Sequence, residues 1–192
     1  RQYFTGEILR TDDTEMANMT EHQPFTITIE DQAISDLNIR LNHSRFSQQI
    51  ANEPWTLGTD RDTLISLCRY WETTFDWRSA ERQLNEWPQF VCEIQGEQLH
   101  YAHIRSPHPD ATPLVMTHGW PGSIAEFLDI VGPLTNPVAH GGRERNAFHI
   151  VLPSLPGFGF SGPTQRMGNS PTQMASMIKQ LMADLGYSSY VA

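Results

Sequence analysis

The sequence predicts an α/β fold, in which a mostly parallel sheet flanked by helices follows a helical N-terminal segment. Two observations indicate this. Apolar runs at 114–116 and 148–152 have the length and continuity of strands buried on both faces. Each run leads through a Gly- and Pro-containing loop toward a segment with helically spaced apolar residues, at 124–131 and 174–185. Repetition of this strand–loop–helix order is typical of α/β proteins.

Composition limits the classes of function. The chain has 192 residues, 39% of them hydrophobic and 18% charged, which allows one good core or a small domain beside a partial one. A formal net charge of −9 argues against a nucleic-acid partner, because phosphate binding needs a basic surface. The sequence contains no signal peptide pattern and no apolar run long enough to span a membrane. Because the chain begins at Arg1 rather than Met, a removed upstream segment stays open. A cytoplasmic and a membrane-associated parent protein therefore both stay open.

The cysteines and histidines predict neither a disulfide framework nor a metal site. Cys68 lies on the apolar face of a predicted helix and Cys92 in a predicted strand, so both are interpreted as packed thiols. His100 and His103 are three residues apart in one predicted strand and therefore point to opposite faces. We expect no metal and no cofactor.

The first ninety residues predict an arm of short elements. Residues 1–23 are polar and aperiodic, which predicts an extended or disordered lead-in. The apolar residues Phe25, Ile27 and Ile29 alternate with threonines and predict a short strand. A helix is predicted to begin at Asp31, because Ile34, Leu37 and Leu41 would share one face of it.

A second helix is predicted to begin within 59–62, where Thr59 and Asp62 resemble a capping box. Its apolar stripe contains Trp71 and Phe75, and Trp77 follows. These aromatic residues could line a ligand pocket or anchor a core. Their helical spacing favours the core.

A β-hairpin is predicted next. Residues 90–94 and 99–104 have the composition of strands, and Gln95-Gly96 lies in the turn between them. We place the domain boundary just before this hairpin. The predicted organisation is therefore a lead-in over 1–23, an N-terminal arm over 24–89 and a partial α/β core over 90–192.

The last predicted elements follow a polar connection at 136–146. Ser170 as N-cap and Pro171 at the first helical position start a well-specified helix, and Gly186 ends it. Its apolar side is interpreted as core packing and comprises Met174, Met177, Ile178, Leu181, Met182 and Leu185. Residues 187–192 are predicted to begin another strand.

The loop at 117–123 carries the main candidate site. Thr117-His118-Gly119-Trp120-Pro121-Gly122-Ser123 follows the strand ending at Met116, and Ser123 can cap the next helix. Backbone N–H groups in this turn between a strand and a helix, together with the helix dipole, can stabilise an oxygen that becomes negative during a reaction. A loop of the form HGxP after a strand is the pattern of the α/β-hydrolase oxyanion loop.

Two longer stretches make the resemblance more specific. His118-Gly119-Trp120-Pro121-Gly122-Ser123 and then 148–161, which reads FHIVLPSLPGFGFS, resemble the epoxide hydrolase family. Phe75-Asp76-Trp77-Arg78, Leu84-Asn85 and Pro88-Gln89-Phe90 are similar to the N-terminal region of its microsomal-type branch. The resemblance covers 24–192 with the motifs in family order.

The resemblance implies hydrolysis of a small-molecule epoxide to a vicinal diol, with water as co-substrate. A carboxylate would open the epoxide to form an alkyl-enzyme ester, and a His-activated water would hydrolyse that ester. The backbone N–H of Trp120 would stabilise the oxyanion of the second step, while His118, Gly119 and Pro121 would support the loop. The arm would wrap the core and contact the lid.

Several catalytic groups implied by the family have no counterpart in these residues. The sequence contains no nucleophile elbow of the form Gly-x-nucleophile-x-Gly. We therefore expect the nucleophile, the relay acid, the base His and the lid tyrosines to lie downstream, and the isolated chain to be inactive. An esterase or haloalkane dehalogenase of the same fold is an alternative, as is a noncatalytic interaction fragment. The oligomeric state and the identity of the epoxide stay open.

Overall fold

The computed structural model describes residues 20–50 and 53–192. Contacts divide the chain into two compact units. Residues 27–83 form the helical unit, and residues 84–192 with the described part of 1–26 form the sheet unit. The lead-in is predicted for 1–23, of which residues 1–19 lie outside the described residues, whereas Gln23 already belongs to a strand. The predicted domain limits stay predictions.

The helical unit contains α1 (Asp31–Asn42), α2 (Arg61–Thr73) and most of α3 (Trp77–Leu84). The predicted start of the second helix was nearly right, but Asp60 is its N-cap rather than Thr59. Its carboxylate accepts the Thr63 N–H at 3.0 Å, which is the bond that an N-cap makes to the third helical residue.

Ionic contacts hold the ends of this unit together. Arg78 of α3 pairs with Asp31 at the start of α1 and, at 2.6 Å, with Glu81. Glu81 also accepts the Ile29 N–H at 2.7 Å. These bonds lower the pKa of Glu81, with the bond from Ile29 as the main cause. The segment before α1 is thereby attached to α3.

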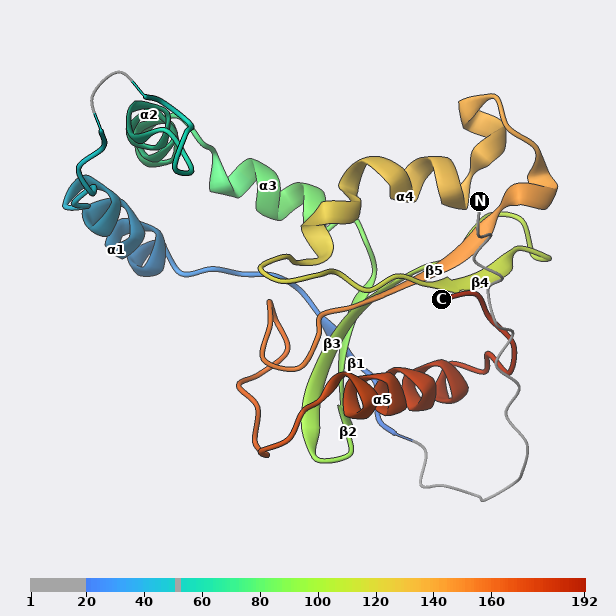
Figure 1. The fold of residues 1–192 in the computed structure, drawn as a ribbon. Coiled ribbons are helices and arrows are strands. Elements are labelled where there is room, and N and C mark those ends of the chain that lie inside the picture. The colour runs from blue at the N-terminus through green and yellow to red at the C-terminus, as the bar shows by residue number, and fades with distance from the viewer. Residues whose placement is uncertain (1–19, 51–52) are drawn as a thin grey trace. The chain divides into compact units, whose positions relative to one another are not determined.

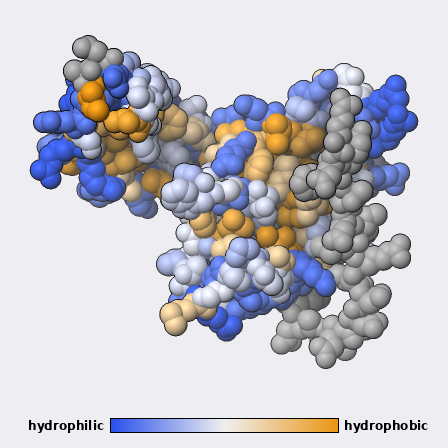
Figure 2. Space-filling view, in the orientation of Figure 1, coloured by the Kyte–Doolittle hydropathy of each residue, from blue (hydrophilic) through white to orange (hydrophobic). Residues whose placement is uncertain are grey.

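The aromatic residues of α2 and the following turn are not buried as predicted. Trp71 is 47% exposed and Phe75 41% exposed. They line an apolar groove of about 530 Å³ within the helical unit. Figure 2 shows hydrophobic side chains at the surface of this unit. The prediction that Trp71 and Phe75 anchor a core is wrong in this chain, because the opposing residues of α1 cover them only in part.

The sheet unit is built on a five-stranded sheet with the order β1-β2-β3-β5-β4 (Figure 1). The first four of these strands pair antiparallel, and β4 pairs parallel with β5. The strands are β1 (Gln23–Phe25), β2 (Gln89–Ile94), β3 (Glu97–Ile104), β4 (Thr112–Val115) and β5 (Phe148–Pro153).

The first strand is earlier and shorter than its sequence pattern predicts. The alternation of Phe25, Ile27 and Ile29 indicated a strand, yet pairing ends at Phe25, which lies opposite Gln89. Gln89 is the first residue of β2, and the preceding Pro88 has no N–H with which to continue the ladder. Ile27 is nevertheless buried.

The predicted hairpin is present with its turn at Gln95-Gly96. Both residues have positive φ, 55° and 77°, as a two-residue type I′ turn requires. In this hairpin, Cys92 is buried, which raises the pKa of its thiol to about 12. A thiol with that pKa is a packed group rather than a nucleophile.

Helices lie on both sides of the sheet in Figure 1. The helix α5 (Pro171–Asp184) buries Met177, Leu181 and Met182 in a cluster that includes Val151. The neighbouring residues of β5, Ile150 and Leu152, are also fully buried but point to the opposite face, because side chains alternate along a strand. Helix α4 (Leu128–Thr135) packs against β5. The core therefore has two layers.

Helix α5 has the termini that the sequence predicts. Ser170 accepts the Gln173 N–H at 3.3 Å, Pro171 is the first helical residue, and Gly186 has a φ of 84° just after the end. The remaining helical turns are short 3₁₀ segments, namely η1 (Ile124–Phe127), η2 (Pro137–His140) and η3 (Glu144–Asn146).

The strand predicted for 187–192 is present only as a single bridge. Val191 pairs parallel with Leu114 on the free edge of β4. The Val115 N–H donates to the Val191 carbonyl, and the Val191 N–H donates to the Pro113 carbonyl, each at 2.9 Å. These two bonds give the last residues the direction of a further parallel strand.

Candidate active site

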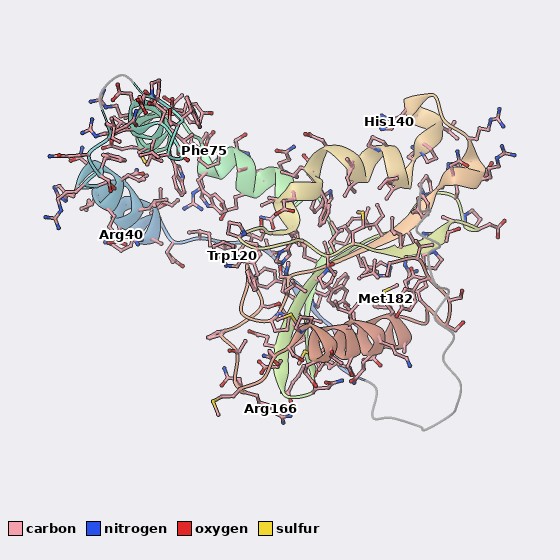
Figure 3. The ribbon with its side chains drawn as sticks, viewed as in Figure 1. Arg40, Phe75, Trp120, His140, Arg166 and Met182 are labelled. Atoms are coloured by element: carbon pink, nitrogen blue, oxygen red, sulfur yellow. The ribbon has the colours of Figure 1, made fainter. Side chains whose placement is uncertain are left out.

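The candidate loop, residues 117–123, leaves the sheet at the carboxyl end of β4. Because β4 and β5 are parallel, the loop after β5, residues 154–161, leaves at the same edge. The Met116 N–H still donates to the Val151 carbonyl at 3.0 Å, so the ladder holds the chain up to the first loop. Figure 3 labels Trp120 in this loop.

A tight turn shapes the centre of the loop. The Gly122 N–H donates to the Gly119 carbonyl at 2.8 Å, and the Trp120–Pro121 peptide bond is cis. A four-residue turn with cis-Pro at its third position is a type VI turn. A Cβ on Gly122 would lie 3.0 Å from the Gly119 carbonyl oxygen, so this position is closely packed against the backbone.

The backbone N–H of Trp120 has no acceptor within the described residues. It belongs to no helix. Trp120 as a whole is 84% exposed. Ser123 caps the following turn by accepting the Ala125 N–H at 3.3 Å, as predicted. That turn is 3₁₀, so the expected contribution of an α-helix dipole comes only from the short helix α4 behind it.

His118 braces the loop with both ring nitrogens. Its side chain is buried, its Nδ1 lies 2.9 Å from the Gly119 carbonyl oxygen, and its Nε2 accepts the Leu155 N–H at 3.1 Å. A carbonyl can only accept and an amide N–H can only donate, so Nδ1 carries the proton and Nε2 does not. Both nitrogens are thus occupied, which leaves His118 no free nitrogen for proton transfer.

The loop after β5 contains buried polar residues that the sequence analysis did not single out. Ser154 and Ser161 are buried, and Ser161 Oγ donates to the Ser154 carbonyl at 2.7 Å. His100 of β3 is also buried, with its Nδ1 2.9 Å from Ser154 Oγ. A polar His within the apolar run Leu99–Ala102 was the available sequence signal for this cluster.

The His, Cys and carboxylate side chains of the described residues do not gather into a metal-binding cluster. Within residues 20–50 and 53–192, no group of three or more His, Cys, Asp or Glu side chains could hold a metal ion. His100 contacts Ser154 and Gln89, whereas His103 contacts Tyr187 at 2.8 Å.

In the described part of the chain, the helices are all too short or too polar to cross a bilayer.

The fold and the loop together define a class of protein. Counted from β2, strand β4 is the third strand of the core, and the loop between the third strand and its helix supplies an oxyanion donor in the α/β-hydrolase fold. The sheet, flanked by helices on both sides, has that fold. The α/β-hydrolase fold class predicted from the sequence is therefore confirmed. The described sheet is nevertheless mixed rather than mostly parallel as predicted, since three of the four pairings between its strands are antiparallel.

Comparisons with known proteins identify the family. The description "Epoxide hydrolase N terminus" belongs to a family profile that matches residues 22–127. A putative epoxide hydrolase of Stigmatella aurantiaca is 43% identical over 169 residues, which are 88% of this chain and 38% of that protein. The chain belongs to the epoxide hydrolase family, and the resemblance predicted from the motifs is confirmed.

Solved structures agree with this assignment. The crystal structure of juvenile hormone epoxide hydrolase from the silkworm Bombyx mori matches with a TM-score of 0.79 and 34% identity, over 89% of this chain and 45% of that one. The Aspergillus niger epoxide hydrolase matches with a TM-score of 0.74 and 34% identity, over 88% and 44%. The chain thus spans less than half the length of each relative.

Proposed function

We propose that this chain acts in the hydrolysis of a small-molecule epoxide to a vicinal diol, and that the Trp120 backbone N–H is its oxyanion donor. The observation that carries the proposal is an unpartnered amide at the carboxyl edge of two parallel strands, within the described residues. The family assignment supports epoxide hydrolysis over the esterase and haloalkane dehalogenase alternatives.

The proposed reaction has two steps. A carboxylate attacks an epoxide carbon, the C–O bond breaks, and the ring oxygen takes up a proton to become a hydroxyl. Water, which gives a proton to the base His, then attacks the carbonyl carbon of the alkyl-enzyme ester, and the carbonyl oxygen becomes negative in the tetrahedral intermediate. Donation from the Trp120 N–H stabilises that carbonyl oxygen. Collapse of the intermediate breaks the ester C–O bond, the leaving diol oxygen takes the proton from the base His, and the carboxylate is restored.

The remaining loop residues hold the donor in place. His118 ties Gly119 to the loop after β5, and Gly119 in turn accepts the Gly122 N–H that closes the turn. Pro121 sets the backbone at the centre of that turn. These three residues are the proposed support of the oxyanion loop. Residues 24–89 form the proposed arm, and residues 90–192 the proposed part of the hydrolase core.

The proposal assigns the nucleophile, relay acid, base His and lid tyrosines to residues outside these 192. No elbow motif occurs in the sequence, and the chain spans 38% of its relative from Stigmatella. We therefore expect the isolated chain to leave styrene oxide unchanged. The full gene product that contains it should convert styrene oxide to the diol.

Removal of one N–H tests the oxyanion role in that full gene product. Trp120→Pro deletes the donor and keeps the Gly119 carbonyl as an acceptor. We expect kcat to fall about 10²- to 10³-fold, with a burst of epoxide consumption as the ester accumulates. Trp120→Ala is the matched control, because it keeps the N–H and removes only the indole.

Two outcomes would overturn the proposal. If Trp120→Pro folds normally and its ester turns over at the rate of the unmodified protein, Trp120 is not the donor. If the full gene product hydrolyses 4-nitrophenyl acetate or releases halide from a haloalkane but spares styrene oxide, the reaction is of another class. Circular dichroism and thermal unfolding confirm that each variant is folded.

A further inference from the structure

A line of buried hydrogen bonds leads from the hairpin to the oxyanion loop. Its central member is His100, which is fully buried on β3 and packs against the rings of Phe25 and Phe160, with centroids at 4.9 and 5.2 Å. Its Nε2 lies 2.9 Å from Gln89 Oε1, and its Nδ1 lies 2.9 Å from Ser154 Oγ. A polar ring in such surroundings needs both partners, because an unpaired buried polar atom is costly.

The positions of the protons in this line of hydrogen bonds follow from Gln89, which lies at the end away from the oxyanion loop. Gln89 Nε2 donates to the Leu84 carbonyl at 2.9 Å, so Gln89 Oε1 faces His100 as an acceptor. Nε2 of His100 therefore carries the proton, and Nδ1 accepts from the Ser154 hydroxyl. Burial lowers the pKa of His100 to about 4, which keeps the ring in this neutral form near pH 7.

Ser154 is held from several directions. Its N–H donates to the His100 carbonyl at 2.9 Å. Ser161 Oγ accepts the His100 N–H at 2.9 Å and donates to the Ser154 carbonyl at 2.7 Å. A Cβ on Gly159 would lie 3.0 Å from Ser154 Oγ, so the hydroxyl is also closely packed. Backbone and side chain of Ser154 are thus both attached to β3.

The next residue carries the line to the candidate site. Leu155 donates its N–H to His118 Nε2, and His118 Nδ1–H donates to the Gly119 carbonyl, whose peptide bond includes the Trp120 N–H. Displacement of Ser154 would move the Leu155 N–H. The His118 imidazole, which holds the Gly119–Trp120 peptide, would then be fixed less tightly. An error of about 1 Å in a donor's position is enough to weaken its effect on a transition state.

We propose that Gln89, His100 and Ser154 are positioning residues for the oxyanion loop, acting through Leu155 and His118 on the orientation of the Trp120 N–H. This inference rests on the proposed function for its kinetic consequence. Its structural consequence, a coupling between Gln89 and the loop, can be measured without any activity.

The structural test uses NMR on the 192-residue chain. Ser154→Ala removes the hydroxyl that faces His100, and Gln89→Met removes the acceptor at the far end of the line. We expect both variants to shift the Trp120 and Gly122 amide signals and the His118 ring nitrogen signals. Ser106→Ala is the matched control, because Ser106 is a buried serine that donates to the Thr135 carbonyl at 2.6 Å near the opposite edge of the sheet. It should leave those signals in place.

The kinetic test uses the same variants in the full gene product. We expect Ser154→Ala and Gln89→Met to slow hydrolysis of the alkyl-enzyme ester about two- to tenfold with KM little changed, which is the effect of weakening one hydrogen bond. Ser106→Ala should lower thermal stability without slowing this step.

The outcomes separate the inference from the proposed function. If Gln89→Met is folded and leaves the loop signals and ester hydrolysis unchanged, or if Ser106→Ala shifts them equally, the line only stabilises the core and the inference fails. If Trp120→Pro has no kinetic effect while Gln89→Met still shifts the loop signals, the proposed function fails and the coupling stands.

Discussion

Helices α2 and α5 have the same kind of sequence and different surroundings. Both are amphipathic, and both begin at a side-chain N-cap, Asp60 and Ser170. In α5 the apolar face is covered by the sheet, and Leu181 is fully buried. In α2 the apolar face lines the groove of the helical unit, and Leu67 is 58% exposed.

The difference shows what helical periodicity predicts and what it leaves open. Apolar residues at helical spacing predict which face of a helix avoids water. Whether that face is covered depends on a second surface, and for α5 this is the sheet. The same Leu→Ala substitution should therefore have unequal effects in the two units.

The largest effect is expected from Leu181→Ala in α5. Removal of a fully buried leucine from the cluster around Val151 should lower the free energy of unfolding by about 2–5 kcal/mol, because transfer and cavity costs add. Urea unfolding followed by the near-ultraviolet signal of the sheet unit measures this. A loss below about 1 kcal/mol would contradict the two-layer core.

Acid should destabilise the sheet unit at a higher pH than the helical unit. Burial lowers the pKa of both His100 and His103 to about 4, so between pH 6.5 and 4 the unfolded chain binds protons that the folded unit does not. Stability is lost as pH falls through this range, by about 3 kcal/mol for His100 alone.

The helical unit should lose stability in a different pH range. The pKa values of Asp60 and Glu81 are lowered from 3.8 and 4.5 by hydrogen bonds, chiefly from Gln49 and Ile29. Their contribution is present above those unfolded values and is lost only as pH falls through the lowered ones. Unfolding at pH 7, 5.5 and 4.5, followed by signals from each unit, measures how the stability of each unit depends on pH. Parallel loss of stability in the two units between pH 6.5 and 4.5 would contradict the assignment.

Ser170→Ala should have an intermediate effect. The variant leaves the Gln173 N–H without its cap, which costs about 1 kcal/mol. Amide exchange in the first turn of α5 should quicken accordingly. Asp60→Ala should do the same to the first turn of α2, because capping is local and does not depend on how the helix face is covered. Unequal cap effects would show that the two helices differ in more than burial.

The smallest effect is expected from Leu67→Ala, the matched partner of Leu181→Ala. A leucine that is 58% exposed loses little buried area when truncated, so the free energy of unfolding should change by less than about 1 kcal/mol. Thermal unfolding of the two variants side by side gives the comparison. Equal destabilisation would mean that the apolar face of α2 is covered in solution.

Much of the sheet unit could be predicted because its signals are local. The turn at Gln95-Gly96, the cap at Ser170 and the stop at Gly186 are each read within a few residues. The predicted position of the N-terminal strand differs from the observed one because its length depends on a distant partner, β2, whose first residue is Gln89, directly after Pro88. The burial of Trp71 was misjudged for a related reason, since exposure depends on an opposing surface.

The candidate site divides in the same way. The loop at His118–Ser123 was found from its motif, and its position at the carboxyl edge follows from the parallel pairing of β4 and β5. The roles of both His118 nitrogens became clear only when Leu155, 37 residues away, was placed beside the ring. The line through Gln89, His100 and Ser154 gave no motif because its members are 11 and 54 residues apart.

Sequence alone determined the kinds of most elements, their caps and turns, the position of the candidate loop and the family, because these depend on neighbouring residues or on short motifs. Tertiary structure alone decided which apolar faces are covered, where β1 ends, and which buried polar atoms are paired. The physical reason is that a side chain is covered, and a polar atom is paired, by the group that lies nearest in space. The distance along the sequence does not specify which group that is.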